Sequence, residues 1–225
     1  KWRSQFQESE FKKWDVGSPS CCGLVFNYFC DKFSIKFPDD FKVLAKEADI
    51  VDGALYKSAK DVFQYNSPFR KFSLAISNAE SEKKRHDLQK ILIKNLGLVP
   101  ESQLLKIPVI KKAISCGLKI RTEKLNYYKK HTTVKGNTSF IDIKNPKLSR
   151  WHMVPYYLYP DLLYSVSIGI EKTGNSIAYH IGVGYNVWSK KENNTHLGEL
   201  MKQYGGGGHK GVGATQAKTH DEALK

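Results

Sequence analysis

Four consecutive glycines, Gly205–Gly208, constrain this chain more than any other feature, because they stand directly before His209 inside an otherwise patterned region. Glycine adopts positive φ without strain, so a run of four costs conformational entropy on folding unless another group approaches the backbone closely. Backbone N–H groups bent into a concavity bind anions, phosphate above all, and a neighbouring imidazole adds a hydrogen bond or a charge. The segment is therefore predicted to bind a ligand through Gly205, Gly206, Gly207, Gly208 and His209.

Two plainer explanations of the glycine run are open. Leu197, Leu200, Met201 and Tyr204 recur at helical spacing before it, so Gly205 can be the left-handed residue that ends a helix. That explanation accounts for one glycine of the four. A flexible linker is the second explanation, but linkers are rich in Ser and rarely lie between an amphipathic helix and a further patterned segment. The spacing fits neither the dinucleotide-binding G-x-G-x-x-G motif nor a Walker A loop.

The stretch GGGGH, followed by Val212, Gly213 and Ala214, resembles the signature of the C-terminal associated domain of the DHH (Asp-His-His) phosphoesterases, RecJ-like and oligoribonuclease-like enzymes among them. The resemblance implies that this loop holds the phosphate or the terminal nucleotide of a substrate. It also implies an α/β fold, in which the helical remainder of a DHH catalytic domain precedes a small mixed-sheet α/β DHH-associated domain. We expect residues 1–130 to be the catalytic-domain part with its connecting helices, and residues 131–225 to be the substrate-binding domain.

Asp49 and Asp52 interrupt an otherwise apolar helical segment, and Gly53 follows them. A carboxylate in apolar surroundings is costly unless it is paired, hydrogen-bonded or bound to a cation, although an exposed acid at a helix end explains the pattern equally well. The resemblance implies that Asp49 is a ligand of the family's two-manganese site, with Asp52 as the second choice.

The remaining ligands of that metal site are missing from the sequence. The family needs an Asp-x-Asp-type segment and the Asp-His-His triplet, and no His-His dipeptide occurs in the 225 residues. Because the chain opens at Lys1 rather than at a Met, the resemblance implies that the catalytic motifs lie upstream of Lys1. We therefore assign no catalytic residue within the chain and expect Mn as a cofactor of the full-length protein.

Alternating apolar residues predict a β-hairpin over residues 164–185. Its bulky face carries Tyr164, Val166, Ile168, Ile170, Ile177, Tyr179, Ile181, Val183 and Tyr185. The opposite face of the second strand carries Gly182, Gly184 and His180, and so little bulk suits a surface that a ligand or a helix lies against. A histidine in such a place is more often structural than a ligand contact.

The end of this hairpin departs from the family pattern. In several DHH phosphoesterases the corresponding strand ends with an Arg-Ser pair that grips phosphate, and this chain has Asn186 and Trp188 near that place. An Asn amide can donate to a phosphate or a base edge, and a Trp ring can stack on a base. Asn186 therefore joins the predicted substrate-binding residues, without an arginine-based grip.

The charge of the chain favours a polyanionic partner, since 36 basic residues against 22 acidic ones give a formal net charge of +14. The bias is steepest over Lys111–Lys135, where Tyr127 and Tyr128 accompany the basic side chains. A single-stranded nucleic-acid path has this composition, and so does a helix with tyrosines packed under lysine stems. No apolar run reaches membrane-spanning length. The four cysteines form neither a C-x-x-C pair nor an even spacing, so we expect reduced thiols and a cytoplasmic protein.

The function predicted from these observations is that of the substrate-binding C-terminal part of a metal-dependent phosphoesterase. Its substrates would be short oligonucleotides, nucleoside phosphates or cyclic dinucleotides. The alternative is a non-catalytic nucleic-acid-binding module, because the same associated domain is also appended to alanyl-tRNA synthetases. Both give single-stranded nucleic acid or a nucleotide phosphate as the partner, and both leave open whether this chain is an enzyme by itself.

Overall fold

The computed structural model describes residues 6–10, 12–145, 148, 150–173 and 176–225. The chain forms two compact units. One comprises Lys1–Tyr56 and Tyr65–Gly117, and the other comprises Lys57–Gln64 and Leu118–Lys225.

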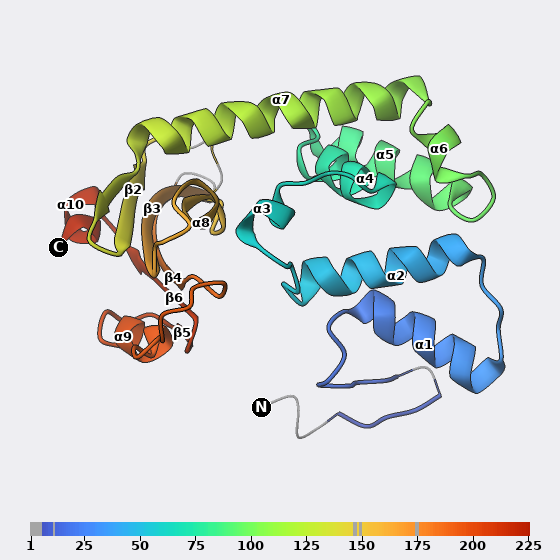
Figure 1. Ribbon diagram of the computed structural model, residues 1–225, viewed down its shortest axis with the longest axis horizontal. Helices are drawn as coiled ribbons and strands as arrows, with labels where there is room; N and C mark the ends of the chain where they lie inside the picture. Colours follow the sequence, from blue (N-terminus) through green and yellow to red (C-terminus); the bar gives the residue numbers. More distant parts are fainter. Residues whose placement is uncertain (1–5, 11, 146–147, 149, 174–175) are drawn as a thin grey trace. The chain divides into compact units, whose positions relative to one another are not determined.

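Helices α1 to α7 come first along the chain, and the strands follow with three short helices among and after them (Figure 1). The helices are α1 (Cys21–Phe33), α2 (Asp39–Asp52), α3 (Ala59–Val62), α4 (Pro68–Ser77), α5 (Glu82–Asn95), α6 (Glu101–Leu104), α7 (Pro108–His131), α8 (Val154–Leu158), α9 (Leu197–Lys202) and α10 (His220–Leu224). The strands are β1 (Thr133–Lys135), β2 (Thr138–Ile143), β3 (Tyr164–Thr173), β4 (Ser176–Tyr185), β5 (Gly207–His209) and β6 (Val212–Ala217). This is the α/β class with a mixed sheet that the sequence predicts.

Serine side chains cap three helices of the first unit. The hydroxyls of Ser20, Ser67 and Ser81 each accept a hydrogen bond from a backbone N–H in the first turn of α1, α4 and α5, which satisfies a donor that has no partner within the helix. The apolar stripes of α4, α5 and α7 then meet in one core, formed by Phe69, Phe72, Ala75, Leu88, Leu92, Leu104, Ile110 and Ile114.

The second unit is built on a six-stranded sheet in the order β1-β2-β3-β4-β6-β5. Strands β2 and β3 run parallel, and the other neighbours are antiparallel. Strand β2 lies in a polar stretch for which the sequence pattern predicts no strand. Its buried positions are Ser139, Ile141 and Ile143. Because the first of these is polar, only two apolar residues mark the alternation in the sequence.

The hairpin of β3 and β4 pairs from Tyr164↔Tyr185 to Thr173↔Ser176, as the alternation predicts. Its bulky face packs against α9, where Val183, Leu197 and Met201 are buried together. We call the opposite side of the sheet the small-residue face. It carries Ser165, Ser167, Gly169, His180, Gly182, Gly184, Ala214 and Gly207.

The glycine run closes α9 and then becomes an edge strand. Gly205 has a φ of +72°, and the N–H of Gly206 donates to the carbonyl of Met201, so the run begins as a left-handed helix end. Strand β5 then pairs with β6, and Figure 1 shows α9 beside both strands. A Cβ on Gly208 would collide with the backbone of Val212, and a Cβ on Gly198 would collide with Gly208.

The two units divide inside α7, after Gly117, whereas the sequence placed a boundary near residue 130. Residues 108–131 form one continuous helix of 24 residues, and its hydrophobic pattern has no break where the packing partners change. That residues 131–225 form the substrate-binding domain stays a prediction. Within the described part of the chain, every helix is too short or too polar to cross a membrane.

Alanine substitutions at Gly207 and Gly208 of β5 should show which of the two positions needs a glycine for backbone packing. Gly208→Ala is expected to lower the free energy of unfolding by roughly 2–5 kcal/mol, because it adds a clash to a φ of +149°. Gly207→Ala should change it by less than about 1 kcal/mol, since nothing lies within 4 Å of its Cβ position. Urea denaturation of both variants measures this, and equal losses would contradict the pairing of β5 with β6.

Candidate anion-binding site

We call the paired strands β5 and β6 the glycine hairpin. The register of the sheet places Gly207 and His209 of this hairpin on the small-residue face. Directly opposite residues of neighbouring strands point to the same side. One row across the sheet consists of Ser167, Gly182, Ala214 and Gly207. His209 lies two residues beyond Gly207 on β5, opposite Val212, so its imidazole is directed to this face as well. Gly207 and His209 thus share a surface with the small residues of β4.

The structure narrows the predicted ligand contact within the glycine run. Gly205 ends α9, and a Cβ on Gly206 or Gly208 would meet the backbone of β6. Gly207 alone of the four combines open space around its Cβ position with a φ outside the left-handed range. The fold therefore accounts for three of the glycines, and their direct contact with a ligand stays a prediction. Gly207 is the position where only an approaching ligand would exclude a side chain.

The edge position of β5 leaves part of its backbone outside the hydrogen-bond ladder of the sheet. In the order of the sheet β5 has β6 on one side and no strand on the other, as far as the structure describes the chain. The outer edge of such a strand presents backbone N–H groups without ladder partners. The side chain of His209 is exposed beside them. An anion placed here can accept hydrogen bonds from the backbone and from the imidazole together.

Asn186 has a different environment from the one that substrate binding requires. It is 2% exposed, and its Nδ2 donates to the carbonyls of Pro160 and Leu162 at 3.1 and 2.8 Å. Its Oδ1 accepts from the N–H of Trp188 at 3.1 Å. Because three backbone groups occupy the amide, Asn186 holds the chain after β4 in place, and we leave it out of the proposed site.

Two basic side chains that the sequence analysis missed, Arg150 and His152, reach the small-residue face. A Cβ on Gly182 would lie 2.8 Å from Nη1 of Arg150 and 3.7 Å from Cε1 of His152. Neither residue belongs to a periodic segment, so no pattern marks them. The indirect signal was the lack of bulk on β4, which indicates that something lies against that strand.

Buried tyrosines fix the segment that carries these two side chains. The hydroxyl of Tyr128 accepts a hydrogen bond from the N–H of Trp151 at 2.7 Å, and burial raises the pKa of Tyr128 to about 12. The hydroxyl of Tyr156 lies 2.8 Å from Oγ of Ser165, and burial raises its pKa to about 12 as well. Both phenols are neutral at physiological pH, so these hydrogen bonds hold over the whole working range.

The predicted metal ligands lie in the last turns of α2, where Asp49 meets the beginning of α1. Oδ1 of Asp49 accepts a hydrogen bond from Oγ of Ser20 at 2.6 Å, and Asp52 is exposed. Over the described ranges of the chain, no group of three or more His, Cys, Asp or Glu residues could hold a metal ion. Two carboxylates fall short of what a pair of metal ions needs. The residues present therefore do not by themselves fit a two-manganese site, and both assignments stay predictions.

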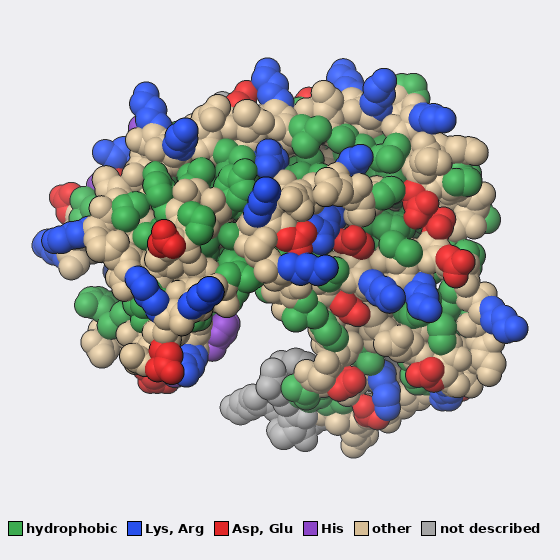
Figure 2. Space-filling view, viewed as in Figure 1, with side chains coloured by type: hydrophobic (Ala, Val, Ile, Leu, Met, Phe, Trp, Pro, Cys, Tyr) green, Lys and Arg blue, Asp and Glu red, His purple; other side chains and the backbone are tan. Residues whose placement is uncertain are grey.

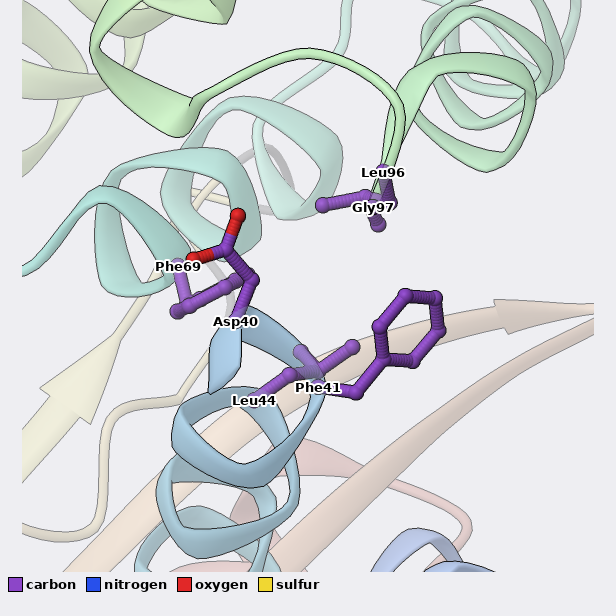
Figure 3. Close-up of a pocket in the computed structure, with 6 residues that line it drawn as sticks. All are labelled: Asp40, Phe41, Leu44, Phe69, Leu96 and Gly97. Carbon is purple, nitrogen blue, oxygen red and sulfur yellow. The ribbon is translucent and has the colours of Figure 1, made fainter. Parts of the chain in front are cut away.

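A shallow hollow on the first unit has the wrong chemistry for an anion (Figure 3). It is lined by Asp40, Phe41, Leu44, Phe69, Leu96 and Gly97. A carboxylate among carbon side chains repels a phosphate, so this hollow does not suit an anion.

Comparison with known proteins supports the fold. No family model matches the chain, and neither does any curated protein sequence. Among solved structures, the pGpG-specific phosphodiesterase PggH from Vibrio cholerae matches with a TM-score of 0.72 and 19% sequence identity. The match covers 92% of this chain and 70% of that protein. The two proteins share a fold.

This likeness confirms the α/β fold class that the sequence predicts. A sequence identity of 19% supports a shared fold and does not extend to the residues of a site. The case for the site rests on the geometry of Gly207, His209 and the small-residue face.

Truncating Asn186 tests whether its amide serves the fold. Asn186→Ala should lower the free energy of unfolding by about 2–4 kcal/mol, because it removes three hydrogen bonds from a buried site at about 1 kcal/mol each and leaves their partners unsatisfied. Thermal and urea unfolding measure the loss. A variant as stable as the wild type, with weaker nucleotide binding, would return Asn186 to the site.

Proposed function

We propose that this chain is the substrate-binding part of a metal-dependent phosphoesterase that acts on short oligonucleotides, nucleoside phosphates or cyclic dinucleotides. The observation that supports it most is the open position of Gly207 beside His209, on the same face of the sheet as Gly182 and Ala214. A protein of the same fold is, by its name, specific for pGpG. A linear dinucleotide is therefore the first ligand to try.

Each part of the site has a separate task in this proposal. The outer edge of β5 and the imidazole of His209 bind a phosphoryl group, and the absence of a side chain at Gly207 lets the group approach the backbone. Ala214, between Gly207 and Gly182 in the same row, leaves room for the remainder of the nucleotide as far as Gly182, where Arg150 lies over the sheet. Binding at fixed donors orients the substrate, and orientation alone contributes much of a phosphoesterase's rate.

Metal chemistry stands apart from the tasks that this chain's own residues carry in the proposal. The family resemblance implies manganese, but Asp49 and Asp52 alone do not fit a two-metal site, so no step of the proposal is assigned to a metal. Asp49 and Asp52 would supply part of the ligand set. The tasks of the second unit, binding and orienting a nucleotide, do not depend on these ligands.

The basic surface of α7 provides a second point of attraction for a nucleic acid. Figure 2 shows Lys and Arg side chains gathered along this helix, and Lys129 and Lys130 are exposed at its end. Tyr128 is 1% exposed, and Tyr127 stacks on His131 with ring centroids 4.3 Å apart. The lysines can therefore contact phosphates, while Tyr128 belongs to the core and is closed to bases.

Substitutions in the hairpin test the proposed function. His209→Ala should weaken pGpG binding roughly ten- to a hundredfold, because it removes a hydrogen bond to a charged group that contributes about 1.5–3 kcal/mol. Gly207→Val should weaken it further by filling the space into which the ligand moves. Isothermal titration calorimetry measures both affinities.

Stability provides the control for these variants. The fold does not need the exposed side chain of His209, and it has room for a side chain at Gly207. Both variants should therefore melt within a few degrees of the wild type. Unchanged pGpG affinity in both, or a sharply lower melting temperature for His209→Ala with intact affinity, would refute the site.

Salt dependence tests the contribution of α7. Binding of a short single strand should weaken as salt rises, and Lys129→Ala combined with Lys130→Ala should reduce the slope of log K against log salt by about 0.7 for each phosphate that the lysines neutralise. Fluorescence anisotropy between low and physiological salt gives the slope. If the double variant keeps the wild-type slope, the lysines are solvated surface.

A further inference from the structure

Arg150 occupies the space that the glycines of β3 and β4 leave free. A Cβ on Gly169 would lie 2.9 Å from Cγ and from Cδ of Arg150, and a Cβ on Gly182 would lie 2.8 Å from its Nη1. The arginine stem therefore lies flat on the small-residue face, across both strands. This accounts for the two glycines without a ligand, and it leaves the guanidinium at the centre of that face.

Two imidazoles accompany the guanidinium. The Cβ position of Gly182 that touches Arg150 is 3.7 Å from Cε1 of His152. His180 lies on β4, opposite Gly169 in the register, so its ring shares the side of the sheet on which Arg150 lies. Three nitrogen-bearing side chains from two segments of the chain thus converge on one small area.

Two nitrogen atoms of this cluster are buried without a hydrogen-bond partner among the described residues. They are Nη1 of Arg150 and Nδ1 of His180. A buried polar atom without a partner is destabilising by a full desolvation penalty, and such atoms in native proteins mark a bound water or ion more often than a real vacancy. A guanidinium carries its charge at every physiological pH, so the missing partner of Arg150 is an acceptor, and an anion fits it best.

The acidic groups near the cluster do not fill this role. Glu171 on β3 is close enough to attract Arg150 and His180, but no ion pair joins it to Arg150 among the residues that are described, and its Oε2 faces Nε2 of Gln216 at 3.4 Å. The phenol of Tyr128, which also lies near Arg150, is neutral. The cluster therefore keeps an excess of positive charge.

We propose that Arg150, His152 and His180 form a second anion subsite, which binds a phosphoryl group. The inference deepens the proposed function and rests on it for the identity of the ligand, a nucleotide that also contacts the glycine hairpin. Gly182 and Gly207 lie in one row of the sheet, two strand spacings apart, which is about 10 Å. One dinucleotide can therefore reach His209 with one end and Arg150 with the other.

The subsite should bind more tightly at lower pH. Burial lowers the pKa of His180, and the charge of Arg150 lowers it further. Glu171 and the backbone groups of His180 and Ile181 oppose this without reversing it, so the imidazole is neutral at pH 8 in the free protein. A bound dianion favours the charged imidazole and raises its pKa. Proton uptake therefore accompanies anion binding, and affinity rises as the pH falls towards 6, by at most tenfold per pH unit for each proton taken up.

Inorganic sulfate is the probe, because its charge is constant over this pH range. Side-chain NMR signals of His152 and His180 should shift saturably on titration with sulfate at pH 6, with roughly three- to tenfold weaker binding at pH 8. Arg150→Met keeps the stem on the glycines and should weaken sulfate binding at least tenfold. His180→Gln should remove most of the pH dependence. Lys190→Met removes a charge from an exposed position elsewhere in the same unit and should leave both unchanged.

The outcomes separate this inference from the proposed function. If sulfate leaves both imidazole signals in place, or if Arg150→Met binds as the wild type does, an adventitious ion or a water satisfies the cluster and the subsite is refuted. Should Arg150→Met fail to fold, Arg150→Lys must bind sulfate several-fold more weakly for the subsite to stand. Dinucleotide affinity of His209→Ala, measured in parallel, judges the hairpin alone, so either idea can fail while the other survives.

Discussion

The second unit depends on the close approach of three backbone segments, and glycine is the residue that permits it. Helix α9 lies so near β5 that a Cβ on Gly198 would collide with Gly208, and β5 lies so near β6 that Gly206 and Gly208 have no room for one either. This approach fixes β5 at the edge of the sheet. It also turns His209 towards the side on which β4 is stripped of bulk. The position of Gly207 and His209 is therefore a consequence of packing.

Sequence reasoning recovered the parts of this arrangement that repeat. The alternation of bulky residues predicted the hairpin of β3 and β4, and the helical spacing before Gly205 indicated α9. The left-handed helix end at Gly205 was one of the explanations that the sequence left open for the glycine run. Strand β2 escaped notice because buried Ser139 interrupts its apolar period. The division of the chain inside α7 was hidden for a related reason, since one continuous helix serves both units.

The chemistry of the site was less accessible to the sequence than the fold. A run of four glycines points to close approach but does not say whether a ligand or a strand approaches, and the structure gives β6 and α9 as the answer for Gly206 and Gly208. Arg150 and His152 come from an irregular segment, so only the three-dimensional fold brings them to β4. Asn186 shows the opposite case, because a plausible donor in the sequence proves to be occupied by its own backbone neighbours.

The likeness to a pGpG-specific phosphodiesterase extends over most of this chain at 19% identity, so what the two proteins share is a scaffold. The central claim is that a nucleotide lies on the small-residue face between the hairpin and β4. Amide chemical-shift mapping with pGpG tests it most directly. The account predicts saturable shifts at Gly182, Gly207 and His209, with little change in α1 and α2. Shifts confined to the helices of the first unit, with β4 and β5 silent, would contradict it.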